Sequence, residues 1–350
     1  MSLRVVLLCP GRGSYTAAQL GALGGLDAHP RGGALRELLA REDPLRRRAG
    51  DLAVADMDGA ESFSASFLRG ENAAPLIFAV GAYDALRIDP ERARVVAVAG
   101  NSMGWYSALY CAGALELDDA WRLVTTMGSM TRDGAIGGQI IYPAVDEEWR
   151  ADPARCQQID DALERVVGAG HAAGRSIRYG GFEVLWADGP GLDALLAALP
   201  QWDLGSRSYP IRLLGNSAFH SDLMDPVVER ARAQLADLGL RAPTVPLIDG
   251  RGMQWRPLTA GADDLRDYTL ATQVTETFDF TAAVRVALRE YAPDRLVLLG
   301  PGESLGSAVA QVLIAERWQG IDSREAFLAR QAAEPVVVSM ARPEQAKEIV

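Results

Sequence analysis

Apolar residues along this chain occur in short unbroken runs, separated by segments whose apolar positions repeat every three or four residues. Short runs of this kind predict strands buried on both faces, and the repeating segments predict helices that cover them. The predicted strands of the main core span residues 3–9, 95–100, 245–248 and 295–299. The predicted helices lie around residues 17–23, 34–41, 75–86, 105–115, 118–130, 226–238, 281–290 and 305–314. This alternation favours an α/β protein with a parallel sheet.

The pattern changes between residues 136 and 213, where short strands alternate with two helices. Strands are predicted at 139–143, 176–187 and 207–213, and helices at 153–167 and 189–199. A unit of this size and order is typical of a small ferredoxin-like subdomain. We therefore predict a parallel-sheet, α/β-hydrolase-like core formed by residues 1–135 and 214–350, with residues 136–213 inserted into it. The segment after Glu316 has no place in this scheme and is expected to be an appendage.

One strand run ends in a pattern that points to chemistry. Gly100-Asn101-Ser102-Met103-Gly104 follows the run at 95–100 and precedes a helical pattern. A sharp strand-to-helix turn of this form exposes a serine oxygen, and glycines on either side keep the backbone from clashing. The motif alone also fits an ordinary turn serine, but its flanking elements favour a nucleophile at Ser102. The Met103 N–H, at the start of the helix, would be the first oxyanion donor.

Composition and charge narrow the classes of function. The 350 residues are 49% hydrophobic and carry a net charge of -11, which argues against nucleic acid as a partner. No apolar run is long enough for a membrane span, and the first ten residues do not resemble a signal peptide, so a cytoplasmic protein with no membrane partner is expected. The only lysine is Lys347. This makes Schiff-base chemistry, a pyridoxal phosphate anchor and a Walker lysine improbable. Three separated cysteines and three histidines predict reduced thiols and no metal site.

A serine nucleophile needs a histidine within hydrogen-bonding reach. His220 lies in the small, polar segment Asn216-Ser217-Ala218-Phe219-His220-Ser221, just before a helical pattern. His29 and His171 lie in glycine- and alanine-rich surroundings and are interpreted as solvent-exposed bystanders. His220 is therefore the candidate base.

Four separated motifs, taken in order, resemble the malonyl-CoA:acyl-carrier-protein transacylases and the acyltransferase domains of polyketide synthases. They are Pro10-Gly11-Arg12-Gly13-Ser14, the Ser102 motif, Ala218-Phe219-His220-Ser221 and Gly300-Pro301-Gly302, supported by Gln273-Val274-Thr275. The resemblance implies a Ser102–His220 dyad, with an oxyanion held by the N–H groups of Met103 and Arg12. It also implies that a main-chain carbonyl near Gln273 orients the histidine. The implied substrates are phosphopantetheine thioesters on acyl carrier protein or CoA, with no bound cofactor.

Three departures from the family concern what the serine carries. Asn101 replaces the usual histidine beside the nucleophile, and Arg12 replaces the usual glutamine of the first glycine loop. Met127 stands where malonyl-specific members carry a carboxylate-binding arginine; a register shift of one would put Thr126 there, and neither residue can pair with a carboxylate. Arg132 lies five residues along and falls on a different helix face, so Arg12 is the better candidate for a substitute cation. Asn101, Phe219 and Met127 are expected to shape the acyl pocket.

These observations predict an acyltransferase for a neutral, non-malonyl acyl group, serving polyketide or fatty-acid-like biosynthesis through an acyl-serine intermediate. A hydrolase that clears acyl groups from carrier proteins would use the same dyad, because water access depends on pocket shape. A third hypothesis is a non-catalytic docking partner in a synthase assembly. The presence of both Ser102 and His220 counts against this third hypothesis.

Overall fold

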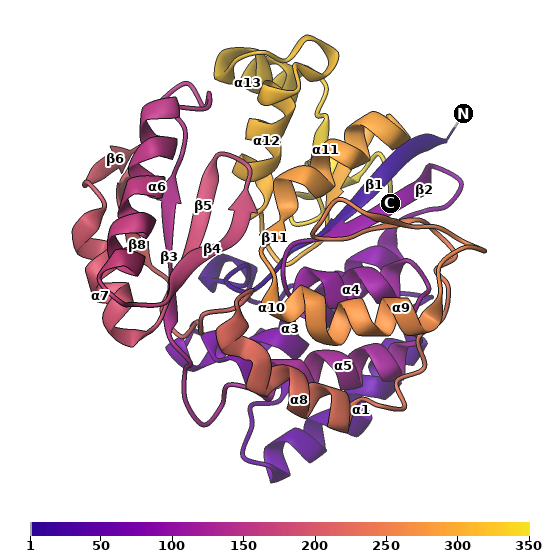
Figure 1. Ribbon diagram of the computed structural model, residues 1–350. Helices are drawn as coiled ribbons and strands as arrows, with labels where there is room; N and C mark the ends of the chain where they lie inside the picture. Colours follow the sequence, from indigo (N-terminus) through magenta and orange to yellow (C-terminus); the bar gives the residue numbers. More distant parts are fainter. Residues whose placement is uncertain (1) are drawn as a thin grey trace.

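A computed structural model describes residues 2–350 and contains a six-stranded main sheet in the order β10-β9-β2-β1-β12-β13 (Figure 1). All neighbouring strands run parallel except β10, which is antiparallel to β9. The strands are β1 (Leu3–Cys9), β2 (Ala93–Gly100), β9 (Leu247–Ile248), β10 (Gln254–Trp255), β12 (Arg295–Leu298) and β13 (Val337–Ser339). The predicted α/β class with a mainly parallel sheet is confirmed.

Helices cover both faces of the main sheet. In Figure 1, α4 (Gly104–Cys111) lies on one side of β1 and β2, and α11 (Phe280–Tyr291) lies on the other. The remaining helices outside the small sheet are α1 (Gly33–Arg48), α2 (Val54–Asp58), α3 (Gly70–Arg87), α5 (Leu117–Ser129), α8 (Asp225–Gln234), α9 (Ala262–Asp267), α10 (Gln273–Thr275), α12 (Gly306–Ala315), α13 (Arg324–Ala333) and α14 (Pro343–Ala346). Within residues 2–350, none of the helices is long and apolar enough to cross a bilayer.

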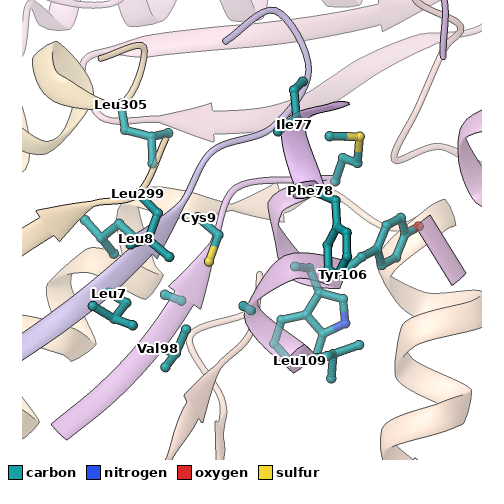
Figure 2. Packing of buried hydrophobic residues seen from close by; sticks show 14 of the residues in the cluster. Leu7, Leu8, Cys9, Ile77, Phe78, Val98, Tyr106, Leu109, Leu299 and Leu305 are labelled. Atoms are coloured by element: carbon teal, nitrogen blue, oxygen red, sulfur yellow. The ribbon is translucent and has the colours of Figure 1, made fainter. Parts of the chain in front are cut away.

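The central strand β1 is buried on both faces, as its unbroken apolar sequence predicts. Figure 2 shows Leu8 beside Leu299 and Leu305, while Cys9 points to the opposite side, where Phe78 of α3 lies. Val5, Val6 and Leu8 are fully buried. The sheet thus gives a rigid base for the loops at the carboxyl ends of β1 and β2, where parallel α/β proteins place their ligand sites.

A second sheet has the order β11-β4-β5-β3-β8 and a small core of its own. Its elements are β3 (Gly138–Pro143), α6 (Pro153–Gly168), β4 (Ala173–Tyr179), β5 (Phe182–Ala187), α7 (Gly189–Ala198), β8 (Ile211–Arg212) and β11 (Phe278–Asp279). Numbered within this unit, the first four strands lie in the order 4-1-3-2 with two helices between them, which confirms the predicted ferredoxin-like arrangement. The predicted strand at 207–213 is divided into β8 and a hairpin strand, β7 (Arg207–Tyr209), which pairs with β6 (Trp202–Leu204). The division of the chain at residues 136 and 213 stays a prediction, because β11 reaches this sheet from the later part of the chain.

Two local predictions were wrong. The predicted helix at 17–23 is a single 3-10 turn, Ala17–Gln19, because the backbone leaves the helical path at Leu20, with ψ 130°, and Gly21 then adopts φ +82°. The segment after Glu316 is not an appendage: β13 pairs with β12 as the edge strand of the main sheet, and its residues are buried. A three-residue strand at the end of a charged stretch carries too little periodicity to be recognised from sequence.

Candidate active site

Ser102 sits on a strained turn between β2 and α4. Its φ is +54°, a conformation that non-glycine residues rarely adopt and that is held only when the surroundings require it. A Cβ at Gly100 would lie 2.2 Å from the carbonyl oxygen of Gly104, and a Cβ at Gly104 would lie 2.1 Å from the carbonyl oxygen of Cys9. Both glycines are therefore required by close backbone approach, and the turn lifts the serine oxygen away from the sheet.

His220 lies within hydrogen-bonding distance of this serine. The Ser102 Oγ is 2.8 Å from His220 Nε2, and His220 Nδ1 is 2.7 Å from the main-chain carbonyl oxygen of Gln273. Because a carbonyl oxygen can only accept, Nδ1 carries the proton and Nε2 has a free lone pair for the serine hydroxyl. The arrangement fixes the tautomer that a general base needs, without a carboxylate.

Burial keeps this histidine neutral. His220 is 3% exposed, and its ring packs 5.4 Å from the ring of Phe278. Desolvation lowers the pKa of His220 to about 4, while the hydrogen bond to Gln273 opposes the shift. The imidazole is therefore in its basic form at any pH well above 4.

Gln273 contributes its side chain as well as its carbonyl. Its Nε2 donates to the carbonyl oxygen of Ser102 (3.1 Å), and its Oε1 accepts from the hydroxyl of Tyr106 on α4 (3.0 Å). A π-helical turn, Tyr268–Thr272, leads directly into this residue. Gln273 thus links the turn that carries the serine to the base. Tyr106 was missed from the sequence because a buried tyrosine in a helix gives no chemical signal.

The two predicted oxyanion donors flank the turn. Within residues 2–350, neither the Met103 N–H nor the Arg12 N–H donates a hydrogen bond to another protein group. The glycine loop that carries Arg12 is joined to the turn by the Asn101 N–H, which donates to the carbonyl oxygen of Cys9 (2.9 Å). Both amides are therefore free for the role that the resemblance implies, which is to stabilise a negative charge that develops near the serine.

Ser102 and His220 open into a narrow cavity that leaves about 60 Å³ to the centres of water-sized molecules. This is several times what one water molecule requires. Its apolar lining comes from Met103, Tyr106, Met127, Met130, Phe219, Met224, Val227 and Val274. Its other lining residues are Arg12, Ser102, Gly128, Thr131, His220 and Gln273. Four of the chain's eight methionines are in this set, so the wall is apolar and adaptable.

The structure resolves where the predicted specificity residues lie. Met127 and Phe219 line the cavity, whereas Thr126 lies on another surface, beside Asp51 and Arg132. Arg132 pairs with Asp51 at 2.7 Å and does not line the cavity, as predicted, but the helix-face argument does not apply to it, because α5 ends at Ser129 and Arg132 lies in the turn that follows. Asn101 is not brought to the cavity wall: it is buried behind the turn, and its Oδ1 has no hydrogen-bond partner within the described residues.

Arg12 supplies the one cationic side chain among the described residues that line the cavity. Its Nη2 donates to the carbonyl oxygens of Leu68 and Gly215, both at 3.0 Å, and its guanidinium lies 5.5 Å from the ring centre of Phe219. Burial lowers the pKa of Arg12, and the charge of Glu71 partly offsets this, but an arginine stays charged.

A network of polar side chains, which the sequence analysis did not identify, holds the loop that precedes His220. Gln139 donates to the hydroxyl of Ser176 (2.6 Å), which donates to the carbonyl oxygen of Phe219 (2.7 Å). Asn216 donates to Gln139 (2.9 Å). These bonds fasten the loop before His220 to the small sheet, so the small sheet helps to hold the base in place.

Comparison with known proteins finds relatives of this chain, although no family model matches it. Malonyl CoA-acyl carrier protein transacylase of Escherichia coli K12 is 25% identical over 219 residues, which cover 62% of this chain and 65% of that protein. A polyketide synthase of Streptomyces halstedii is 29% identical over 243 residues, which cover 69% of this chain and 3% of that much longer protein. The matched region thus spans slightly less than two thirds of the length of the transacylase relatives.

Solved structures show the same fold. A malonyl-CoA:acyl carrier protein transacylase of Xanthomonas oryzae superposes with a TM-score of 0.72 at 19% identity, covering 99% of this chain and 98% of that one. The corresponding transacylase of Synechocystis gives a TM-score of 0.71 at 18% identity, covering all of both chains. The resemblance drawn from the motifs is confirmed at the level of distant homology.

Proposed function

We propose that this divergent homologue of the malonyl-CoA:acyl-carrier-protein transacylases and polyketide synthase acyltransferase domains is an acyltransferase for a neutral, non-malonyl acyl group. The acyl group would pass from one phosphopantetheine thioester to another, on acyl carrier protein or CoA, in fatty-acid-like or polyketide biosynthesis. The observation that carries the proposal is the Ser102 oxygen, hydrogen-bonded to a neutral His220 at the wall of a narrow, apolar cavity.

The geometry of the site supports the following steps for the transfer. His220 Nε2 takes the proton as Ser102 Oγ attacks the thioester carbonyl carbon, and the resulting oxyanion lies against the N–H groups of Met103 and Arg12. When the intermediate collapses, the carbon–sulfur bond breaks and the departing thiolate takes the proton from His220. A second phosphopantetheine thiol then reverses these steps and releases Ser102.

The neutral character of the acyl group is inferred from the cavity wall that contains Met127. Met127, on α5, lines the cavity at the position where an arginine would be needed to bind a substrate carboxylate. Arg132 is already paired with Asp51. A hydrogen bond to a charged group contributes about 1.5 to 3 kcal/mol, and a carboxylate without its partner also has a desolvation cost. Malonyl and methylmalonyl groups are therefore poor substrates for this cavity.

Mass spectrometry of the intact protein tests the proposal. The protein is incubated with acetyl, butyryl and malonyl thioesters of CoA and of a carrier protein, and the acyl mass on Ser102 is measured. We expect acetyl or butyryl loading and transfer to a second carrier, with little malonyl loading. Ser102→Ala should gain no mass, whereas Ser62→Ala, at an exposed serine outside the cavity, should behave like the unchanged protein.

Three outcomes would contradict parts of the proposal. Efficient malonyl loading would overturn the argument from Met127. Release of free acid without transfer to the second carrier would indicate the hydrolase that uses the same dyad. If no thioester adds acyl mass and Ser102→Ala has no effect on product formation, the protein is not an acyltransferase. The hypothesis of a non-catalytic docking partner would then be the one supported.

A further inference from the structure

The Arg12 side chain raises a question that the catalytic scheme does not answer. Only its main-chain N–H takes part in the proposed transfer, yet Arg12 lines the same narrow cavity as Ser102, and its guanidinium lies over the ring of Phe219, another lining residue. Within residues 2–350, no carboxylate lies within ion-pairing distance of this guanidinium, and no acidic side chain lines the cavity. The positive charge of Arg12 thus has no ion-pair partner among residues 2–350, and the charge of Glu71 acts on it from beyond ion-pairing distance.

The hydrogen bonds of Arg12 restrict what it can bind. An arginine Nη2 has two hydrogens, and here both are donated, one to the carbonyl oxygen of Leu68 and one to that of Gly215. Nε is buried and has no partner among the described residues. Nη1 makes no hydrogen bond within the described chain and is not buried, so it is the nitrogen left for a ligand.

This pattern disfavours the usual pairing of arginine with a carboxylate. A bidentate pair needs two parallel N–H groups, from Nη2 together with either Nε or Nη1. Both Nη2 hydrogens already hold main-chain carbonyls, so a bidentate pair would have to break one of these bonds. A single oxygen acceptor can bind at Nη1 without any such loss.

We propose that Arg12 Nη1 donates a hydrogen bond to an oxygen on the acyl chain, so that the site selects short, neutral acyl groups that carry a hydroxyl, ether or keto oxygen over their plain alkyl counterparts. The small volume requires a short chain, and Met127, Met130 and Phe219 accommodate its carbon atoms. The stacking of the guanidinium over Phe219 and its two carbonyl contacts hold the donor in one position. This inference rests on the proposed acyl transfer at Ser102.

Pairs of thioesters that differ only by oxygen in place of a methyl or methylene group test the inference. Glycolyl is compared with propionyl, and methoxyacetyl with butyryl, by the rate at which each CoA thioester acylates Ser102 in the full-length protein. We expect at least one oxygen-bearing member to be favoured about tenfold or more, the range for one hydrogen bond to a charged donor. A ratio near one for both pairs would overturn the inference, and this measurement needs no variant.

Variants at Arg12 separate recognition from a structural role. Arg12→Met removes every donor and should bring the ratios close to one, while Arg12→Lys, which keeps a charged donor, should retain part of the preference. If Arg12 only holds the Leu68 and Gly215 loops together, Arg12→Met would lower all rates in parallel and leave the ratios unchanged. Thermal unfolding of each variant identifies general loss of structure.

The proposed function and this inference fail in different ways. No acylation of Ser102 by any thioester contradicts the acyltransferase itself, whereas acylation with equal rates within each pair contradicts only the role of Arg12. A malonyl thioester is tested alongside these pairs. If malonyl loads faster than glycolyl, and this advantage is lost in Arg12→Met, then Arg12 binds a carboxylate. That result would overturn the proposal that the acyl group is neutral.

Discussion

The catalytic pair and the acyl wall line one cavity, but they are built from different kinds of contact. His220 is held by the carbonyl oxygen of Gln273, and the expected oxyanion donors are main-chain N–H groups. The acyl wall is lined mainly by residues with large apolar side chains, with Met127 and Phe219 as its expected specificity residues.

This difference explains which departures from the family can be tolerated. The N–H of Arg12 belongs to the main chain and is present whatever the side chain is, so an arginine in place of glutamine keeps the proposed oxyanion donor. The change at Met127 alters the wall directly, because nothing except the side chain defines the wall there. Chemistry carried by the backbone can therefore persist while recognition carried by side chains changes.

The largest expected effect is the loss of the base. His220→Ala should lower the rate of Ser102 acylation by a factor of about 10² to 10⁴, because the serine loses its proton acceptor. Stopped-flow release of CoA measures this rate. His171→Ala, at a partly exposed histidine that does not line the cavity, is the matched control and should change little. Equal rates for His220→Ala and the unchanged protein would refute the dyad.

Substitution of a glycine in the turn that carries Ser102 is expected to have the next largest effect. Gly104→Ala would place a Cβ 2.1 Å from the carbonyl oxygen of Cys9, so we expect a loss of about 4 kcal/mol or more in the free energy of unfolding. Gly168→Ala, at the end of α6 with open space around it, should stay within about 1 kcal/mol. Urea denaturation measures both. A stable, active Gly104→Ala protein would contradict the close backbone packing.

The burial of His220 should also affect the pH dependence of the free energy of unfolding and of the acylation rate. Because the pKa of His220 falls from 6.5 in the unfolded chain to about 4 in the folded protein, the unfolded state binds the extra proton between these values. Stability contributed by the neutral histidine is complete above pH 6.5 and is lost as the pH falls toward 4, by about 3 kcal/mol. Acylation should stay active down to about pH 4.

Urea unfolding at pH 7 and pH 4.5, compared between the unchanged protein and His220→Gln, isolates this contribution. The variant should lose less stability over the interval, because it has no histidine at this position to titrate. An acylation rate that falls already near pH 6.5 would mean that His220 is more accessible to water than its burial indicates.

A smaller effect is expected at the acyl wall. Met127→Arg should raise malonyl loading relative to butyryl loading about tenfold, because a guanidinium on α5 would face the cavity. Thr126→Arg is the matched control, since Thr126 lies outside the cavity and should leave the ratio unchanged. Competition between the two thioesters, read by intact mass, gives the ratio. An equal gain in both variants would mean that bulk charge, rather than position, is responsible.

The smallest expected effect tests the link between the two halves of the dyad. Tyr106→Phe removes the hydroxyl that donates to Gln273 Oε1, so acylation should fall about fivefold, in line with a contribution of about 1 kcal/mol for one hydrogen bond. Tyr110→Phe, on the same helix and without a hydrogen bond from its hydroxyl in the described residues, is the control. A similar decrease in both variants would assign the effect to helix packing.

The sequence located those elements whose signal is local. β1 and β2 were predicted because unbroken apolar runs mark strands buried on both faces, and the Ser102 turn was predicted because its glycines and flanking elements form one contiguous motif. β13 was missed because its position depends on pairing with β12, and no local sequence pattern predicts that pairing. The network of Gln139 and Ser176 was missed for the same reason, since its members are distant in the chain.

By itself, the sequence determined the α/β class, the serine turn, the candidate base and the apolar character of position 127, because each depends on residue type and short-range order. The tertiary structure decided that His220 meets the carbonyl oxygen of Gln273, and that Met127 rather than Thr126 faces the cavity. It also decided that Arg12 lines this cavity and that both of its Nη2 hydrogens are donated to main-chain carbonyls. The physical reason is that hydrogen bonds and cavity walls form between groups brought together from distant parts of the chain, and periodicity along one segment carries no record of them.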